Sequence, residues 1–414
     1  MTRAASIDDI VTRGLCVGCG LCESLAGADK LKLGLNAEGF LRPKQLMPLD
    51  AETERKVLAV CPGNVQRVEG TDSPVDVIWG PLKGLFAGYS RDEEIRFKGS
   101  SGGVATAVAA HMLNSGMASA VLEVSADSAA PLHAVTRVAK NRSELIEGAG
   151  SWYGPAAPLR RMHELLDKGK PFVVIGKPCD IAGVRNLARI DPRVDRLVVC
   201  TISFLCAGLS SFGVARNIIA GHGVEEKDVS LFRFRGHGCP GMTRIETHDG
   251  RAFEQTYDDT WSHALNQAIQ FRCKICPDST GEQADIVCAD AWDNDDGYAH
   301  GEKEGRGAIL ARTERGLAIL KSMQTRAELE MQPLELSRFE RMQPHHKHRK
   351  SVLVARLLGL WLGGQPVPDY KGLRLFSASR FGRRYLFSNV RGMIRRIKSG
   401  ANRETLPAGG ERRE

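Results

Sequence analysis

Eleven cysteines in a chain of 414 residues constrain this sequence more than any other feature. The first residues, MTRAASIDDIVTRG, lack the apolar region and the cleavage site of a secretory signal, so nothing indicates export and a disulfide framework. Thiols of intracellular proteins stay reduced, and clustered thiols then indicate metal. We therefore expect a cytoplasmic protein whose cysteines bind metal.

Four cysteines near the N-terminus have the spacing of bacterial ferredoxins. Cys16, Cys19 and Cys22 are separated by two residues each, and the remote Cys61 is followed by Pro62. Such a loop wraps one face of a cubane cluster, and the remote cysteine completes the set of thiolates. Zinc is the alternative, although it prefers two separated CxxC pairs. The spacing predicts a [4Fe–4S] cluster in this N-terminal segment.

A second set of cysteines is spread along the chain. Cys273 and Cys276 form a CxxC pair, which alone indicates either a zinc knuckle or a redox dithiol. Cys179 and Cys206 each follow an apolar run that reads as a buried strand, and the ends of neighbouring strands can share one pocket. Four thiols gathered in this way would hold a second cluster. Cys200 competes with Cys206, because alternation along a strand places both on one face.

The middle of the chain has an α/β pattern. Glycine just after a helical stretch and β-rich runs after it indicate helix-to-strand units. We predict helices over residues 104–114 and 181–187, and strands over 120–124, 171–175, 197–205 and 284–288. The fold class is therefore α+β (mixed α/β), with a small ferredoxin-like [4Fe–4S] segment before an α/β body.

A glycine-rich turn, GSSGG at residues 99–103, precedes the first of these helices. Its glycines allow close approach of a ligand to the backbone, and a helix N-terminus favours anions. The turn is neither GxGxxG nor a Walker A loop, so it does not indicate a general dinucleotide or ATP site. Judged alone, a plain helix cap explains it better than a phosphate site does.

Charge is distributed unevenly along the chain. Residues 346–414 hold 16 Lys and Arg against 4 Asp and Glu, whereas the whole chain has a net charge of +8. The basic residues do not alternate with aromatic residues over the body, so we expect no nucleic-acid partner. No apolar run is long enough to span a membrane. An apolar face over residues 383–398 predicts a helix that either packs on the body or makes peripheral contact with an acidic donor or a membrane surface.

The order of several motifs resembles the coenzyme F420 hydrogenase/dehydrogenase beta-subunit family. They are CVGCGLC, FKGSSGGVATAVAAHML, GSWYGPAAPLR, VVIGKPCDIAGVRNL, ISFLCAG, FRFRGHGCPG and FRCKICPDSTGEQADI. This family includes iron–sulfur flavoproteins that reduce chlorophyll-type pigments with ferredoxin electrons, and subunits of hydrogenase and formate dehydrogenase complexes. Two positions depart from the family pattern, Trp152 and the Cys288–Ala289 pair.

The resemblance implies four regions and a set of site residues. The regions are a [4Fe–4S] head at 1–75, a flavin-binding part at 80–165, a part with the second cluster at 166–345, and a basic, partly helical tail at 346–414. The implied cluster ligands, besides the head set, are Cys179, Cys206, Cys273 and Cys276. The implied FAD contacts are Ser100, Ser101, Gly102, Gly103, Val104, Ser151, Trp152 and Tyr153.

The resemblance also implies an oxidoreductase. Electrons from a low-potential, ferredoxin-like donor would pass through two [4Fe–4S] clusters to FAD, and then to a small organic substrate or to the deazaflavin coenzyme F420. Arg233, Arg235 and His237, in a glycine-rich loop, are candidates for holding an anionic substrate or donating a proton. The alternative is an electron-transfer beta subunit that acts with coenzyme F420 beside a hydrogenase or dehydrogenase subunit.

Overall fold

The centre of the computed structural model, which describes residues 3–70, 74–292 and 301–408, is an eight-stranded mixed sheet. Its strands, in spatial order, are β16 (Leu329–Pro333), β6 (Gly84–Ser90), β15 (Gly307–Ala311), β14 (Ile286–Asp290), β10 (Val198–Phe204), β9 (Phe172–Ile175), β7 (Ala120–Ala126) and β8 (Ala134–Ala139). The four strands β14, β10, β9 and β7 are parallel, and each of the remaining pairs is antiparallel. This is the mixed α/β architecture predicted from the sequence.

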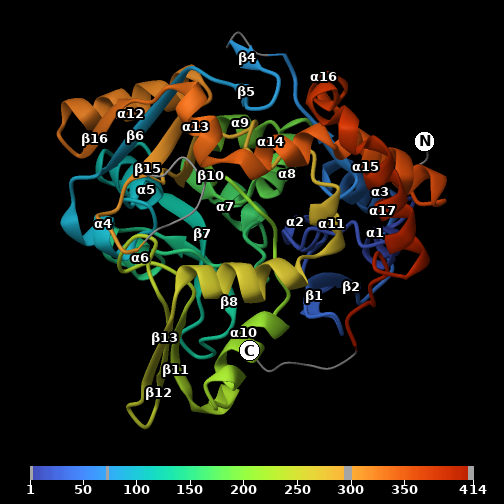
Figure 1. Cartoon of the computed structure of the whole chain (residues 1–414), viewed down its shortest axis with the longest axis horizontal. Coiled ribbons are helices and arrows are strands. Elements are labelled where there is room, and N and C mark those ends of the chain that lie inside the picture. The colour runs from blue at the N-terminus through green and yellow to red at the C-terminus, as the bar shows by residue number, and fades with distance from the viewer. Residues whose placement is uncertain (1–2, 71–73, 293–300, 409–414) are drawn as a thin grey trace.

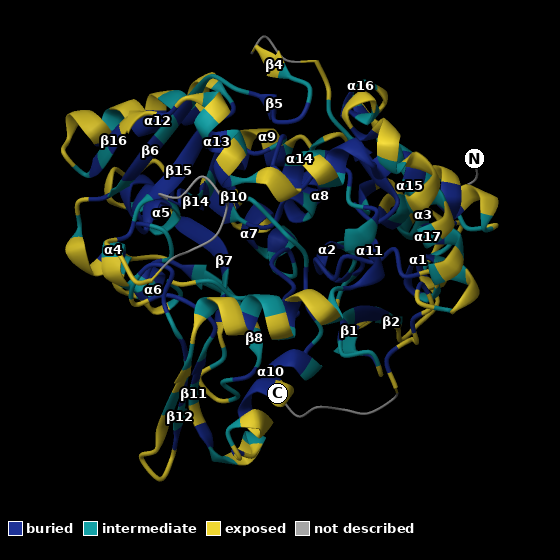
Figure 2. Ribbon diagram, in the orientation of Figure 1, coloured by how far each residue is buried: buried dark blue, intermediate teal, exposed yellow. Residues whose placement is uncertain are grey.

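Helices cover both faces of the sheet (Figure 1). One face carries α5 (Val104–Asn114), α6 (Arg142–Glu147) and α12 (Glu314–Thr325), and the other carries α7 (Met162–Lys168), α8 (Pro178–Ala188), α9 (Arg193–Leu197) and α13 (Leu336–Met342). Strands buried on both faces need apolar residues at successive positions. In β9, Val173 packs in the core beneath α5 while Val174 packs in the opposite core, and both are fully buried. Figure 2 shows the strands as the buried layer between exposed helix surfaces.

All six predicted elements are present, and the bounds of five of them differ from the prediction by one to three residues. The helix predicted at 104–114 coincides with α5. Helix α8 begins three residues earlier than predicted, because Pro178 starts it and the Asp180 carboxylate accepts the N–H of Lys177 at 2.8 Å. Strand β14 begins two residues later than predicted, because Asp285 accepts hydrogen bonds from the backbone and hydroxyl of Thr201 just before the strand begins.

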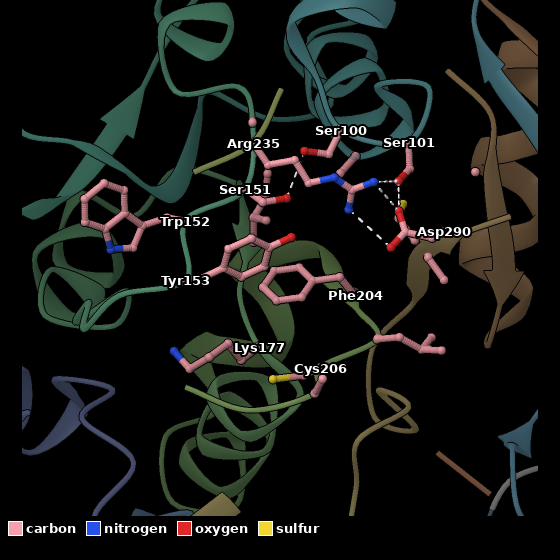
Figure 3. A pocket seen from close by; sticks show the side chains of 18 of the residues that line it. Ser100, Ser101, Ser151, Trp152, Tyr153, Lys177, Phe204, Cys206, Arg235 and Asp290 are labelled. Atoms are coloured by element: carbon pink, nitrogen blue, oxygen red, sulfur yellow. Dashed lines mark hydrogen bonds and ion pairs between the residues drawn. The ribbon is translucent and has the colours of Figure 1, made fainter. Parts of the chain in front are cut away.

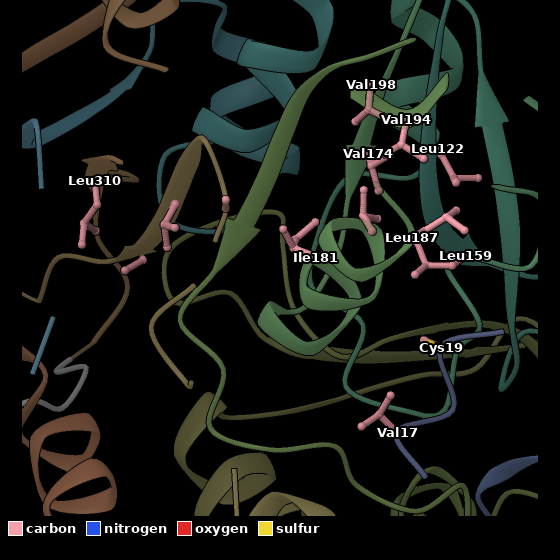
Figure 4. Packing of buried hydrophobic residues seen from close by; sticks show 14 of the residues in the cluster. Val17, Cys19, Leu122, Leu159, Val174, Ile181, Leu187, Val194, Val198 and Leu310 are labelled. Carbon is pink, nitrogen blue, oxygen red and sulfur yellow. The ribbon is translucent and has the colours of Figure 1, made fainter. Parts of the chain in front are cut away.

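The N-terminal head packs directly on this core. Its elements are α1 (Ile7–Thr12), α2 (Leu21–Ala26), β1 (Leu31–Leu35), β2 (Leu41–Gln45), α3 (Ala51–Val60) and β3 (Val65–Arg67). Val17 and Cys19 belong to the same buried cluster as Leu159 and Leu187 of the body (Figure 4). The head therefore shares its hydrophobic core with the sheet.

A smaller unit projects from the body at the bottom of Figure 1. It contains α10 (Gly213–Gly221), the 3-10 turn Glu226–Asp228, and a three-stranded antiparallel sheet of β11 (Val229–Arg233), β12 (Thr243–Thr247) and β13 (Ala252–Gln255). The π-helical turn Asp259–Ala264 and the 3-10 turn Leu265–Ala268 return the chain to the body. The turn formed by β4 (Val75–Asp76) and β5 (Gly80–Pro81) lies at the opposite end.

The tail is helical and packs against the head. It contains α14 (Pro344–Ser351), α15 (Leu353–Leu362), β17 (Asp369–Lys371), α16 (Leu375–Ser379), the 3-10 turn Arg380–Tyr385 and α17 (Leu386–Lys398). Strand β17 pairs in parallel with β3 of the head. The buried Met393 of α17 faces Gly359 of α15, while Arg391 and Lys398 are exposed. The predicted amphipathic helix is thus present and packs on α15 through Met393, while Leu386 and Phe387 at its start remain exposed.

None of the helices in the described ranges has the length and apolar character of a membrane span.

The contact between α15 and α17 requires glycine at position 359. A Cβ there would lie 2.7 Å from the carbonyl oxygen of Val390 and 2.8 Å from the Cβ of Met393, and neither atom can rotate away. We expect Gly359→Ala to lower the free energy of unfolding by about 1–3 kcal/mol, as overpacking does. Gly221→Ala is the matched control, since its Cβ would meet nothing within 4 Å. Urea denaturation measures both, and equal stability of the two variants would contradict this packing.

Candidate functional site

A cavity of about 330 Å³ opens at the carboxyl ends of the parallel strands. Residues of β7 and β14, residues that follow β9 and β10, and the N-terminus of α5 all contribute to its wall. In open α/β sheets this edge is where ligands bind, because loops diverge there and helix N-termini point toward it. The topology therefore places a ligand site where the sequence predicted a cofactor.

The glycine-rich turn forms one wall of the cavity. Ser100, Ser101, Gly103 and Val104 line it, as the resemblance implied, whereas Gly102 does not. The turn follows α4 (Glu93–Lys98) and packs tightly on it. A Cβ at Gly103, whose φ is +69°, would lie 2.3 Å from the carbonyl oxygen of Ile95. Glycine is thus required for the turn to direct the N-terminus of α5 into the cavity.

The second predicted cofactor segment lies beside this turn. Ser151, Trp152 and Tyr153 all line the cavity, and the hydroxyls of Ser151 and Ser100 are 2.8 Å apart. The Trp152 ring packs edge-on against Phe234, with 5.3 Å between the ring centroids. The structure therefore brings together two predicted segments that are about fifty residues apart in sequence.

Of the three predicted catalytic residues, only Arg235 lines the cavity among the residues that the structure describes. It is buried and forms an ion pair with Asp290 at 2.7 Å, and it also donates to the hydroxyl of Ser101 (Figure 3). Burial lowers the pKa of Arg235, but Asp290, Tyr153 and Tyr257 together raise it by more, so the guanidinium stays charged. Because Asp290 neutralises it, Arg235 is suited to holding the cavity wall in place.

Arg233 and His237 lie outside the cavity wall. Arg233 ends β11 and has the charged side chains of Arg244, Glu246 and Glu254 as electrostatic neighbours. The ring of His237 packs on Phe97 at 5.3 Å. Neither side chain is therefore placed to contact a ligand in the cavity.

Glu123 is a cavity residue that the sequence reasoning missed. It lies on β7, is 6% exposed, and its Oε1 has no hydrogen-bond partner in the described part of the chain. Burial raises the pKa of Glu123 to about 8. A charged residue inside the apolar run AVLEVSA was the available signal, because such residues are rarely buried without a partner.

The four head cysteines lie close to one another, with Cys16 and Cys19 buried and Cys22 and Cys61 partly buried. Burial raises the pKa of Cys22 well above its usual range, and the nearby Cys19, Cys16 and Cys61 raise it further. Burial and then Cys16 raise the pKa of Cys61 to about 12. The amide of Gly18 donates to the sulfur of Cys16 at 3.4 Å, as expected of a loop that turns its N–H groups toward a cluster.

The four body cysteines also meet. Cys179 begins α8, Cys206 follows β10, and Cys273 and Cys276 lie in and after α11 (Phe271–Lys274). Burial raises the pKa of Cys206 to about 12, with further contributions from Cys273 and Cys276. Cys179 has Cys206 and Cys276 as electrostatic neighbours. The structure thus gathers thiols from four separate positions into one group.

Cys200 lies apart from this group. Its side chain is fully buried in the core beneath α5, with Asp285 and Cys288 as neighbours. The alternation argument for Cys200 failed because β10 ends at Phe204, so Cys206 no longer follows the strand and its amide donates to Ser279 instead. Of the two competing cysteines, Cys206 is the one beside the CxxC pair.

All eleven cysteines are free, and no three His, Cys, Asp or Glu side chains of the described ranges converge closely enough for one metal ion. The four thiolates of a [4Fe–4S] cluster bind four different irons, so they stand farther apart than the ligands of one zinc ion. Cys206 also lines the cavity, so the body group borders the predicted flavin site.

The raised pKa of Glu123 makes a prediction about stability. Between its unfolded pKa of about 4.3 and its folded pKa of about 8, the folded state keeps a proton that the unfolded state has lost, so stability falls as pH rises. Glu123→Gln removes this titration. We expect the unfolding free energy of E123Q to gain on wild type by up to about 1.4 kcal/mol per pH unit in that window. Denaturant unfolding of the cofactor-free protein over this range measures it, and a constant difference would contradict the assignment.

Comparisons with known proteins agree with this geometry. Residues 85–162 match the N-terminal sequence model of the coenzyme F420 hydrogenase/dehydrogenase beta subunit, and residues 169–337 match its C-terminal model. A coenzyme F420 hydrogenase subunit beta from Methanothermobacter thermautotrophicus is 22% identical, over 69% of this chain and 99% of its own length.

Two further matches extend the comparison. A coenzyme F420-dependent sulfite reductase from Methanocaldococcus jannaschii is 22% identical over 80% of this chain, which spans about half (49%) of the length of that enzyme. A chain in a solved structure of the F420-reducing [NiFe] hydrogenase complex from Methanosarcina barkeri has a similar fold. It gives a TM-score of 0.54 at 20% identity, and the match covers 72% of this chain and 99% of that one. With the two sequence models together matching more than half of its length, the chain belongs to the coenzyme F420 hydrogenase/dehydrogenase beta-subunit family, a family of oxidoreductases.

Proposed function

We propose that this chain is the electron-transfer unit of a larger oxidoreductase that acts with coenzyme F420. It would hold two [4Fe–4S] clusters and FAD, and it would exchange electrons with a hydrogenase- or dehydrogenase-type partner or a ferredoxin-like donor. The observation that carries the proposal is the position of Cys206, which belongs to the body cysteine group and also lines the cavity. A cluster held there would border a ligand in the cavity.

The residues at hand suit these groups. Clusters held by thiolates exchange single electrons, and a flavin exchanges one or two, which is the chemistry that the protein positions. The head set would be held by Cys16, Cys19, Cys22 and Cys61, and the body set by Cys179, Cys206, Cys273 and Cys276. The backbone and hydroxyl groups at the N-terminus of α5 are suited to the phosphates of FAD.

Buried polar groups in the cavity support a nucleotide ligand. Glu123 offers the cavity a carboxyl oxygen that has no partner among the described residues, and a Cβ at Gly148 would lie 2.9 Å from that oxygen. The ion pair of Arg235 and Asp290 fixes the hydroxyl of Ser101. The aromatic rings of Tyr153, Tyr257 and Trp292 line the same cavity.

The names of the relatives favour the relay over a self-contained reductase. The hydrogenase beta subunit is matched over almost its whole length, whereas the sulfite reductase is matched over about half. In that reductase, the part similar to this chain is therefore joined to a comparable length of other sequence. A self-contained reductase of an organic substrate is the second candidate function, because the cavity could also bind a small organic substrate.

The cluster ligands make the first prediction. Anaerobically purified protein should contain about eight irons and one flavin per chain. Cys276→Ala should remove about half of the iron, because the body cluster loses one of its four thiolates. Cys200→Ala is the matched control, and it should leave the iron content unchanged. Iron and sulfide analysis measures both, and a colourless, zinc-containing protein would refute the proposal.

The cavity makes the second prediction. Purified chain with a one-electron dye as artificial partner should oxidise reduced coenzyme F420, which the absorbance of F420 measures. Arg235→Gln should slow this exchange by about tenfold or more, because it leaves the partly buried Asp290 carboxylate without its ion-pair partner. Arg233→Gln, outside the cavity, should change it little. Protein that contains flavin and both clusters but fails to exchange electrons with F420 would point to the second candidate.

A further inference from the structure

Two fully buried arginines lie between the head and body cysteine groups. Arg42 of β2 has no exposed surface, and Arg272 of α11 is 1% exposed. Neither was singled out in the sequence. A buried guanidinium requires a nearby negative charge, because removing it from water is costly unless it is paired.

Arg42 connects the two cysteine groups through hydrogen bonds. Its guanidinium lies against Cys16 of the head group. It also donates to the side-chain oxygen of Gln270 at 2.9 Å, and the amide nitrogen of Gln270 is 3.4 Å from the sulfur of Cys273 in the body group. Burial lowers the pKa of Arg42, but Cys16, Glu404 and Cys273 raise it by more, so it remains a cation.

The charge of Arg42 is balanced by the tail. Glu404 forms a two-point ion pair with it, and one of the two contacts is 2.9 Å long. The pair is closed to water, because the side chains of Arg42 and Glu404 are 0% and 4% exposed. The amide of Glu404 donates to the carbonyl of Thr12, so this part of the tail is attached to the head.

Arg272 has no carboxylate partner in the described ranges of the chain. It donates to the carbonyl of Pro62, next to the head ligand Cys61, at 3.0 Å, and its Nε has no acceptor among the described residues. Its electrostatic neighbours include Cys276 of the body group, and the ring of Tyr370 from β17 covers it at 5.4 Å. The missing counter-charge of this buried cation is what an anionic cluster would supply.

We propose that Arg42 and Arg272 set the reduction potentials of the two clusters, and that Glu404 of the tail adjusts the potential by balancing Arg42. This inference rests on the proposed function, since it requires that both cysteine groups hold clusters. Adding one electron to a thiolate-bound cluster adds one negative charge without a proton, and a nearby fixed cation stabilises the reduced form. A nearby carboxylate has the opposite effect. The tail therefore takes part in electron transfer as a positioning and charge-balancing element.

The experiment uses the full-length protein with its clusters in place. Arg42→Gln should lower the potential of the head cluster, with a decrease of about tenfold in the equilibrium constant for reduction, equivalent to about 59 mV. Glu404→Gln should raise the potential, because it leaves the cation unbalanced. The double variant R42Q/E404Q removes both charges, so the potential of its head cluster should lie close to the wild-type potential. Arg42→Lys keeps the charge and should shift the potential least of the single variants.

Variants at Arg272 test the second cation independently. Arg272→Gln should lower the potentials of both clusters, because the cation lies next to ligands of both, whereas Arg272→Lys should retain most of the wild-type potentials. Redox titration followed by electron paramagnetic resonance measures each cluster, and the signal that remains in the Cys276→Ala variant identifies the head cluster. Iron and sulfide analysis of every variant confirms that its clusters are intact before potentials are compared.

The possible outcomes separate the two levels of the proposal. Opposite shifts for Arg42→Gln and Glu404→Gln, cancelling in the double variant, support the inference, because a purely structural role would not reverse sign. Intact clusters with unchanged potentials in R42Q, E404Q and R272Q would overturn it. Wild-type protein without iron–sulfur signals would instead overturn the proposed function.

Discussion

The parallel arrangement of β7, β9, β10 and β14 determines where every other part of the site lies. Because these strands share one direction, their carboxyl ends meet at one edge, and the residues that follow them converge there. Glu123 comes from β7, Lys177 follows β9, Cys206 follows β10 and Asp290 ends β14. The same topology thus produces both the cavity and the body cysteine group. The two meet at Cys206 in the turn after β10.

The sequence was sufficient wherever the chemistry is local. Cys16, Cys19 and Cys22 lie in one short stretch that runs from a loop into α2, so their spacing predicted that these thiols lie close together. The apolar periodicity of residues 104–114 lies within a single helix, and it predicted that helix. Cys179 and Cys206 required knowledge of the fold, since only the sheet brings them to the CxxC pair. The competition with Cys200 depended on the residue at which β10 ends, and strand ends are the least predictable feature of a sequence.

Other site residues have no local signal because their meaning depends on distant partners. Arg42 and Glu404 are 362 residues apart, yet they form a buried ion pair. A lone arginine in a short strand reads as an exposed residue, and so does a glutamate near the end of a basic tail. Glu123 is a charged residue in an apolar run, and the run predicts a strand without indicating what the carboxyl group contacts.

The tail's contacts also bear on the order in which the molecule is assembled. β17 pairs with β3 of the head, Tyr370 covers Arg272, and Glu404 is held under the head by Arg42 and Thr12. These contacts close the side of the molecule on which both cysteine groups lie, and their residues are synthesised after those of both cysteine groups. Iron and sulfide would then enter while that side is still open, and docking of the tail would be the final step of maturation. Such a closure would protect the clusters from oxygen only after both have been installed.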